Sequence, residues 1–375
     1  MELWKEYKIE DICEQIFAGG DAAKYNSSKH QTALYNIPIY ANSTEKEGLY
    51  GYCDKAIVLS PAVTIAARGA GIGFVAFRNK PFVPIVRLIT LITNNSVDTK
   101  FLYYYLKNRR LSGDGSAIPQ ITVPMVKKEV VTIPALEEQK RIADILSSLD
   151  AKIELNRRIN DNLEQQAQLL FDNLINASDW STTQFLSELS EINPPRKLSK
   201  GEYAPFVEMS NMPTSGSFPS RIDYKEYNGG MKFRNGDTIM ARITPCLENG
   251  KAAYVNFLKE NEIGFGSTEY IVLAPKKTIS SSFLYFLVRN KEFVDYAVKH
   301  MNGSSGRQRV SGDTIGNYQL PILDRNKLSI FIAIADRTLS KIRQNSFEII
   351  NLAKQRDTLL PKLMFGELKI NDLNC

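Results

Sequence analysis

An internal repeat limits most strongly what this chain can fold into. Four short motifs occur twice, in the same order and 174, 182, 188 and 187 residues apart: Thr64–Arg68 with Thr238–Arg242, Phe101–Asn108 with Phe283–Asn290, Gly115–Gln120 with Gly303–Gln308, and Ile133–Pro134 with Leu320–Pro321. Self-similarity of this kind indicates a repeated structural unit. In a chain of 375 residues, it predicts two copies, each too long for a solenoid repeat and of the right size for a domain with an appendage.

A long helix is predicted at the end of each copy. Residues 135–175 contain neither Pro nor Gly, and their apolar residues recur every three or four positions, which is the pattern of a packed helix. Nearly the same stripe recurs 186 residues later, where Pro361 is expected to kink or end the helix. The predicted packing positions are Ile142, Ile145, Leu149, Ile153 and Leu163 in the first helix and Leu328, Phe331, Leu339, Ile342 and Ile349 in the second.

The apolar stripe of each helix needs a partner, and the other helix is the obvious one. A helix of about forty residues is about 60 Å long, so an antiparallel pair would place the two globular parts at opposite ends. Asn156 and Asn160 lie on the first stripe, which continues through Leu170, and we expect them to fix the register of the pair. The alternative is two ordinary core helices of a helical domain.

The globular parts have the pattern of mixed α/β units. Short β-favouring runs are separated by Gly, Pro and Asn, and a helix follows them in each copy. The expected strands are 57–59, 63–67, 73–77, 82–86, 238–241, 252–255 and 270–273, and the expected helices are 99–109, 282–290 and a further one to about residue 300. We predict a mixed α/β (α+β) fold with a pseudo-twofold repeat and four segments: globular 1–134, helical 135–177, globular 178–321, and a helix with a C-terminal tail at 322–375.

Composition argues against several classes of protein. Lys and Arg exceed Asp and Glu by 47 to 41, and the four segments carry net charges of +4, −3, +2 and +3, so the first helix is acidic between basic neighbours. Two His and four scattered Cys suggest no zinc site, disulfide framework or His-based triad. The sequence also has no GxxxxGK[ST] phosphate loop and no apolar run of membrane-spanning length. We therefore expect a cytoplasmic protein without catalytic residues or a metal site.

Three motifs resemble parts of enzyme sites and are interpreted otherwise. Gly69–Gly73 has the spacing of a nucleotide or S-adenosylmethionine turn, but a strand follows it, which favours a glycine-rich hairpin. Asn193–Arg196 is similar to the NPPY/F tetrad of DNA amino-methyltransferases, with Arg in the aromatic position, and we interpret it as a Pro-rich strand entry. Glu138–Lys140 opens the first helix, where acids favour the helix dipole. The alternatives kept open are a DNA amino-methyltransferase with degenerate motifs and a coiled-coil scaffold without DNA function.

Polar and basic residues lie near Gly-rich loops at equivalent places in the two copies. Arg68 and Arg242 end the repeated strand, and the loops 113–120 and 302–309 match each other. Side chains of these types read base edges and phosphates. The candidate DNA-binding residues are Tyr40, Asn42, Ser43, Arg68, Arg109, Arg110, Ser116, Gln120, Asn211, Arg242, Lys251, Ser304, Arg307, Gln308 and Arg309.

The first helix carries a family resemblance. Ile133–Ile142 and its continuation through Arg157–Asn160 strongly resemble the central conserved helix of type I restriction–modification specificity subunits, and Leu359–Leu368 is similar to their closing helix. The second helix begins with Pro321–Arg325 and lacks the usual P-x-x-E-Q opening of the family. Shorter matches resemble the target-recognition domains of the family: Pro38–Tyr40 with Gly51–Tyr52, Arg68–Gly73, and Phe101–Leu106.

The resemblance implies a function and a set of partners. It makes 1–134 and 178–321 two target-recognition domains, each reading one half of a bipartite double-stranded DNA site. The paired helices would set the spacer between the half-sites and hold two modification subunits, which carry the S-adenosylmethionine site and the methyltransferase chemistry. Restriction subunits, which use ATP and Mg, would join that core. The chain itself would be a recognition subunit with no catalytic residue, no cofactor and no membrane contact.

Overall fold

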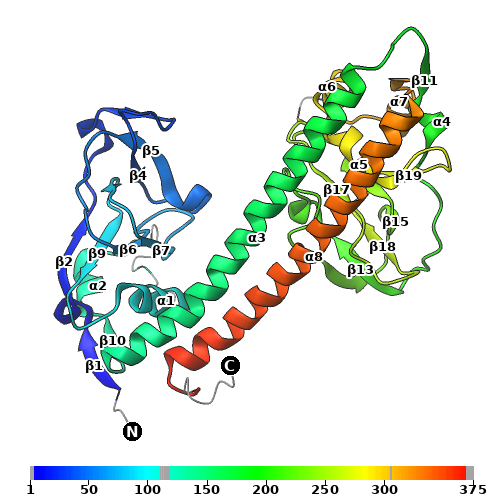
Figure 1. Ribbon diagram of the computed structural model, residues 1–375. Coiled ribbons are helices and arrows are strands. Elements are labelled where there is room, and N and C mark those ends of the chain that lie inside the picture. Colours follow the sequence, from blue (N-terminus) through cyan, green and yellow to red (C-terminus); the bar gives the residue numbers. More distant parts are fainter. Residues whose placement is uncertain (1–3, 110, 112, 114–118, 305, 369–375) are drawn as a thin grey trace. The chain divides into compact units, whose positions relative to one another are not determined.

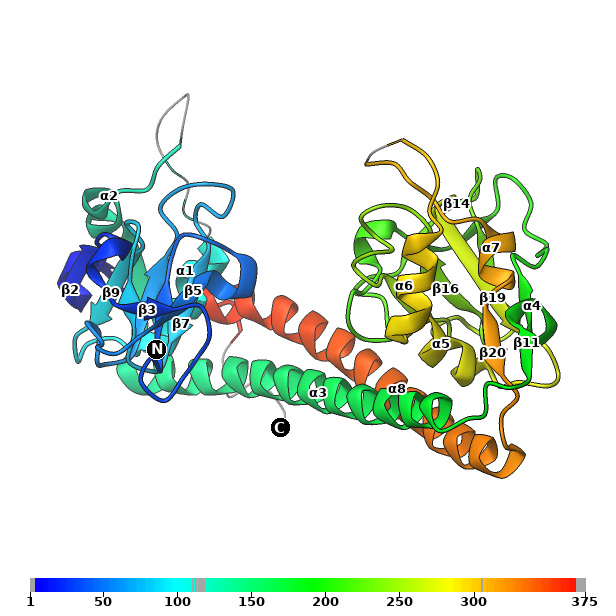
Figure 2. The same cartoon turned by 90° about the horizontal axis from the view of Figure 1, so that it is seen from above.

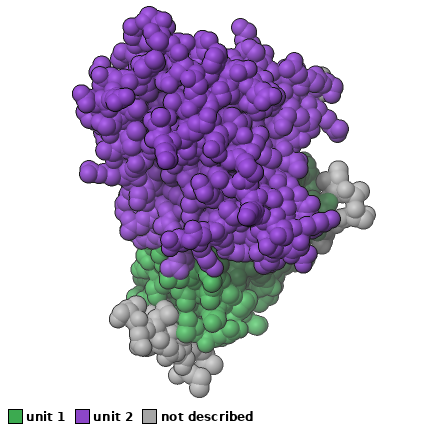
Figure 3. Space-filling model, turned by 90° about the vertical axis from the view of Figure 1, so that its right-hand side faces the viewer, with its two compact units in different colours: residues 1–152, 352–375 green, residues 153–351 purple. Residues whose placement is uncertain are grey.

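The chain folds into two compact units, each of which is described by itself. The computed structural model describes residues 4–109, 111, 113, 119–304 and 306–368 (Figure 1). Unit 1 consists of residues 1–152 and 352–375, and unit 2 of residues 153–351 (Figure 3). Two long helices, α3 (Leu136–Asn176) and α8 (Arg325–Met364), each contribute one part to both units. The assignment of four separate domains stays a prediction.

Unit 1 contains two four-stranded sheets and a strand pair. The first sheet is antiparallel and the second contains one parallel pair, β4 with β8. In order across each sheet, the strands are β2 (Cys13–Ala18), β9 (Ile89–Thr93), β6 (Ala62–Ile65) and β7 (Val75–Arg78); then β3 (Ser27–Ser28), β5 (Leu49–Cys53), β4 (Ile37–Tyr40) and β8 (Val83–Pro84); and the pair β1 (Lys5–Lys8) with β10 (Val130–Ile133). The helices are η1 (Ile9–Ile12), η2 (Ala22–Lys24), η3 (Glu45–Gly48), α1 (Thr99–Arg109) and α2 (Val123–Lys128).

Unit 2 repeats this plan. It also has an antiparallel four-stranded sheet, a second sheet with one parallel pair (β13 with β18) and a separate strand pair. The strands are β12 (Ser190–Ile192), β19 (Tyr270–Pro275), β16 (Thr238–Ala241) and β17 (Ala252–Tyr254); β14 (Asp223–Glu226), β13 (Tyr203–Val207), β18 (Ile263–Gly266) and β15 (Lys232–Arg234); and β11 (Thr183–Phe185) with β20 (Gln319–Pro321). The helices are α4 (Leu186–Leu189), η4 (Met209–Asn211), α5 (Ser281–Arg289), α6 (Lys291–Lys299) and α7 (Gly312–Gly316). The mixed α/β repeat predicted from the sequence is confirmed.

Apolar strands and one helix form the core of each unit. All four residues of β6 and all four of β16 are buried, which is the pattern of a central strand covered on both faces. Helix α1 contacts β6 and β7, and α5 contacts β16, β17 and β19 (Figure 2). Phe101 and Phe283, the first aromatic residues of the repeated helical motif, are both fully buried. The repeated strand and helix motifs therefore lie in the core of each unit.

Helices α3 and α8 pack antiparallel within each unit. In unit 1, Arg356 donates to Asp150 at 2.6 Å, and Ile142 shares a core with Leu363. In unit 2, the rings of Phe171 and Phe331 lie 5.5 Å apart. All ten predicted packing positions are buried or half-buried: Ile142, Ile145, Leu149, Ile153, Leu163, Leu328, Phe331, Leu339, Ile342 and Ile349.

The polar residues of the helical seam bond across it in unit 2. Asn156 Nδ2 donates to Glu348 Oε2 at 3.0 Å, and Asn345 Nδ2 donates to Asn160 Oδ1 at 2.8 Å. Asn160 Nδ2 also lies 3.4 Å from Ser346 Oγ. Because Asn156 and Asn345 are both only 2 % exposed, a shift in register would leave buried amides without partners. This is the role expected of Asn156 and Asn160.

Some predicted details of the chain are wrong. Leu170 is 42 % exposed, and Phe171 is fully buried in its place, because a step of four residues from buried Ala167 returns to the seam. Residues 57–59 form one bridge, between Val58 and Phe82, and no strand. Helix α8 continues past Pro361 to Met364, so the proline lies within its last turn. Asn193–Arg196 follows β12 and does not enter a strand.

Candidate functional site

Arg68 and Gln120 come together in unit 1. Arg68 follows β6, and its Nη2 donates to Gln120 Oε1 at 2.6 Å. The backbone of the same loop is attached to the strand end, because Ile121 N–H donates to the Ala67 carbonyl at 3.0 Å. Arg68 Nε is buried without a hydrogen-bond partner among the described residues. Two residues that are 52 positions apart, both predicted to contact DNA, thus form one polar cluster.

Three other candidates of unit 1 organise the loop after β4. Asn42 Oδ1 accepts from the Ala67 N–H at 2.8 Å, and its Nδ2 donates to the Val86 carbonyl. Ser43 Oγ accepts from the Glu45 N–H at 3.1 Å. The Tyr40 ring lies 3.7 Å from the buried guanidinium of Arg78, a cation–π contact. Their polar groups and ring are engaged within the protein, so these residues position the loop beside Arg68.

The remaining candidates of unit 1 do not join this cluster. Arg109 lies in the last turn of α1, where its Nη2 pairs with Glu129 at 3.3 Å and its Nη1 donates to the Val130 carbonyl. Arg110 and Ser116 lie outside the described residues. Arg109 therefore fastens α1 to the start of β10.

Gly69–Gly73 forms the turn between β6 and β7. Gly73 N–H donates to the Ala66 carbonyl and Ala66 N–H to the Phe74 carbonyl, each at 2.9 Å, and β7 follows as a strand. Gly69 and Gly73 have φ of 79° and 78°, a backbone conformation that favours glycine. A phosphate-binding turn opens a helix, which this turn does not. The geometry is that of the predicted hairpin.

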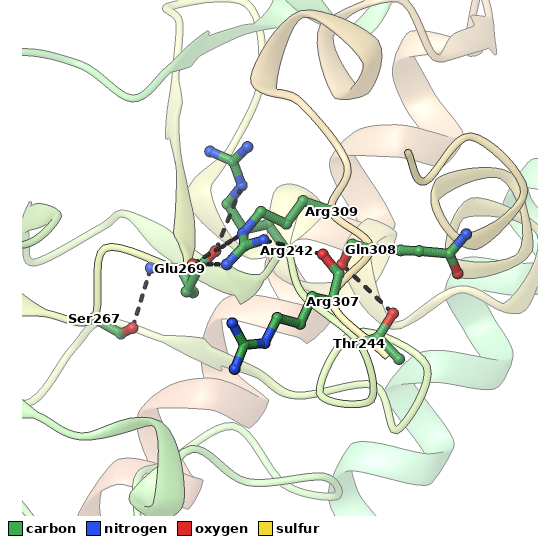
Figure 4. A network of polar contacts seen from close by, with 7 residues as sticks. All are labelled: Arg242, Thr244, Ser267, Glu269, Arg307, Gln308 and Arg309. Atoms are coloured by element: carbon green, nitrogen blue, oxygen red, sulfur yellow. Dashed lines mark hydrogen bonds and ion pairs between the residues drawn. The ribbon is translucent and has the colours of Figure 1, made fainter. Parts of the chain in front are cut away.

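A charged network occupies the equivalent place in unit 2 (Figure 4). Arg309 Nε donates to both carboxylate oxygens of Glu269 at 2.9 Å, and its Nη2 donates to Oε1 at 2.7 Å. Arg242 Nε lies 4.0 Å from Glu269 Oε2, an ion pair without a hydrogen bond, and is otherwise buried and unpartnered among the described residues. Hydrogen bonding from Arg309 holds the pKa of Glu269 below its usual range and raises the pKa of Arg309.

Backbone hydrogen bonds shape the loop that carries Arg309. Asn302 and Arg309 exchange two backbone hydrogen bonds of 2.9 Å, and Val310 N–H donates to the Arg242 carbonyl at 3.0 Å. Thr244 N–H donates to the Gln308 carbonyl at 3.0 Å, and the Thr244 hydroxyl donates to the same carbonyl at 3.5 Å (Figure 4). Between these closures the remaining candidates are exposed or half-buried: Ser304, Arg307 and Gln308.

Lys251 and Asn211 lie at a different loop of unit 2. Lys251 Nζ donates to the Met209 carbonyl at 2.7 Å, and the Asn211 carbonyl accepts from Ser220 N–H at 3.0 Å. Both residues are half-buried. These contacts order the segment that contains η4, and they do not include the residues of the Glu269 network.

Glu269 is the residue that the sequence did not point to. It follows β18 and immediately precedes β19, and 40 positions separate it from Arg309. A single acid in a loop has no periodicity or motif that would mark it. Its role follows only from the fold, which brings the start of β19 beside the end of β16 and the loop before α7.

The motif at the start of α3 has a structural explanation. Gln139 is 1 % exposed; its Oε1 accepts from Asp98 N–H, and its Nε2 donates to the Pro134 carbonyl, each at 2.9 Å. The neighbouring acids pair with bases one turn later, Glu137 with Lys140 and Glu138 with Arg141. Gln139 therefore clamps the helix start to the globular part of unit 1.

The other enzyme-like motif is also structural. Asn193 Oδ1 accepts from Val272 N–H at 2.9 Å and so extends the β12–β19 ladder by a side chain. Arg196 Nη2 donates to the buried carboxylate of Asp237 at 2.7 Å. Among the described residues, no cluster of three His, Cys, Asp or Glu side chains could hold a metal ion, and no helix has the length and hydropathy needed to cross a membrane.

Comparisons with known proteins agree on one family. A family model described as the type I restriction modification DNA specificity domain matches residues 1–165 and 178–327. The MjaIX specificity subunit of Methanocaldococcus jannaschii is 27% identical over 99% of this chain and 94% of that protein. A protein of Mycoplasma pneumoniae assigned as a type I specificity subunit is 32% identical over 40% of this chain, which spans 45% of that relative's length.

A solved structure has the same fold. The crystal structure of a type I restriction–modification S subunit from M. genitalium superposes with a TM-score of 0.64 over 96% of each chain, at 18% sequence identity. At that identity the likeness concerns the fold alone. It covers both copies of the repeat and both long helices.

Proposed function

This chain belongs to the family of type I restriction–modification DNA specificity subunits, which recognise DNA sequence, and we propose that each of its two units reads one half of a bipartite DNA site. One observation carries this proposal: equivalent arginines, Arg68 and Arg242, follow equivalent strands, and both are half-buried in polar clusters. A guanidinium has five N–H donors, and donors on the exposed part of each side chain match the acceptors of a DNA base edge or phosphate.

We expect other chains of the complex to carry out the methylation and cleavage reactions. A specificity subunit is the non-catalytic part of its complex, so we expect S-adenosylmethionine, ATP and Mg to be bound by modification and restriction subunits in the cytoplasm. Two modification subunits would dock on the long helices. This is supported by large apolar side chains that are 40 % to 63 % exposed along α3 and α8 within unit 2: Leu155, Leu169, Leu170, Ile330, Ile334 and Ile350.

The spacer between the half-sites would follow from the long helices. Helix α3 has 41 residues, a length of about 60 Å, which exceeds the roughly 34 Å of one turn of DNA. Two readers attached to such helices would therefore engage half-sites about one turn or more apart.

A selection experiment tests the proposed function. The complex of this chain with its modification subunits is incubated with a library of random duplex DNA, and the bound or methylated molecules are sequenced. We expect two short fixed elements separated by a constant number of unspecified base pairs. Recovery of one continuous element, or of no sequence preference, would overturn the proposal.

A further inference from the structure

We propose that Glu269 is a positioning residue that holds Arg309 so that its guanidinium reads one guanine in the half-site of unit 2. The inference rests on the proposed function, because it names a base contact within that same recognition site. The proposal depends on three properties of the network: the donors that remain on Arg309, the independence of the loop from the ion pair, and the local charge.

The hydrogen bonds of Arg309 leave a pair of donors on its terminal nitrogens. A guanidinium has five N–H donors. Nε–H and one N–H of Nη2 bind Glu269, and one N–H of Nη1 binds the Arg307 carbonyl at 3.0 Å. One N–H on each terminal nitrogen is left over. Two donors of this kind match the O6 and N7 acceptors that guanine presents in the major groove. The Arg309 side chain is 38 % exposed, so part of it is accessible to DNA.

The loop does not need the ion pair for its shape. The backbone hydrogen bonds from Asn302 to Arg309, from Val310 to Arg242 and from Thr244 to Gln308 already close it and attach it to the segment that follows β16. The side-chain contacts of Glu269 therefore fix the direction of the Arg309 guanidinium. Holding a long side chain in its bound conformation lowers the entropy lost on binding and makes the contact selective for geometry.

The Glu269 carboxylate weakens the attraction of the network for a phosphate. It is bonded to the guanidinium of Arg309 and lies 4.0 Å from Arg242 Nε, so it offsets part of the positive charge that a phosphate would meet. A guanine edge is uncharged and keeps the directional hydrogen bonds without this loss. Arg307 is exposed in the same loop and has no acidic partner among the described residues, so it suits a phosphate contact.

The test compares the half-sites selected by complexes that contain single variants. Arg309→Ala should lower the preference for guanine at one position of the unit 2 element by about 10- to 100-fold, which corresponds to the 1–3 kcal/mol of a bidentate base contact. Arg309→Lys keeps the charge without the fork and should lose the same preference. Glu269→Gln should weaken the preference at that same position and raise binding to all sequences. The element read by unit 1 should be unchanged in every variant.

Arg221→Ala is the matched control. Arg221 pairs with Asp223 at 2.6 Å in the same unit, with 72 % of its side chain exposed, and its removal should leave both elements intact. If Arg309→Ala weakens binding to all DNA sequences equally and lowers the salt dependence of that binding, Arg309 contacts a phosphate and the inference is wrong. It is also wrong if Glu269→Gln leaves the guanine preference at full strength. Absence of a bipartite pattern in the wild-type complex would instead overturn the proposed function, and the inference with it.

Discussion

The two units share the strand order of the antiparallel sheet, whereas the parallel pair of the second sheet lies at the edge in unit 1 (β4 with β8) and in the middle in unit 2 (β13 with β18). They also differ in the side chains at equivalent loops. The helix caps Thr122 and Ser311 align Gln120 with Arg309, each two residues before its cap, whereas the sequence repeat had paired Gln120 with Gln308. In unit 1 the loop holds Arg68 through a neutral amide, and in unit 2 a carboxylate holds two arginines. The same arrangement of β16-like strand and loop thus carries a neutral cluster in unit 1 and a charged one in unit 2. Reading two different half-sites would require such a difference.

The starts of the two long helices differ as well. Gln139, five residues after Pro134, is buried and bonds to the globular part of unit 1. The equivalent residue five positions after Pro321 is Asn326, which is exposed, and α8 is instead capped by Asp324, whose Oδ1 accepts from Lys327 N–H at 2.9 Å. The second helix lacks the P-x-x-E-Q motif, and it also lacks the buried hydrogen bonds that Gln139 of this motif makes to the globular part of unit 1.

The largest change in the free energy of unfolding is expected when the Gln139 side chain is replaced. Gln139→Leu leaves the Asp98 N–H and the Pro134 carbonyl without their buried partners, so the free energy of unfolding should fall by about 3 kcal/mol. Urea denaturation of the full chain measures it. Asn326→Leu is the control at the equivalent position and should change the free energy of unfolding by less than about 0.5 kcal/mol. Equal losses in the two variants would contradict the difference between the helix starts.

A smaller effect is expected in the helical seam of unit 2. Asn160→Leu adds apolar volume but leaves the Asn345 amide, which is 2 % exposed, without its partner. The free energy of unfolding should fall by about 1.5 kcal/mol, as measured by thermal or urea denaturation. Asn162→Leu, at an exposed position of the same helix, should have little effect. A stabilised Asn160→Leu protein would show that the polar seam has no role in fixing the pair.

The elements that the sequence predicted are those that depend on local patterns. The apolar stripes of the two long helices follow from helical periodicity, and the error of Leu170 for Phe171 is a shift by one position within the first stripe. Arg68 and Arg242 were found because the repeat marks them. The function of Asn42 was not predictable, because its partner Val86 is 44 residues away and only the folded backbone brings them together.

The pairing of Glu269 with Arg309 was not predictable for the same reason. The two residues are 40 positions apart, and this separation matches no period of a helix or strand. Most acids in loops are solvated, so nothing in the sequence distinguishes Glu269 from them. Only the fold, which brings the start of β19 beside the end of β16 and the loop before α7, shows that Glu269 pairs with Arg309.

The central claim is that each unit reads its own half of the DNA site. Sequencing the sites selected by complexes containing Arg68→Ala or Arg242→Ala tests it most directly. We predict that Arg68→Ala lowers the base preference in only one of the two half-sites and that Arg242→Ala lowers it only in the other. Neither variant should change the length of the spacer. Changes in the same element, or equal changes in both elements, would contradict the assignment of one half-site to each unit.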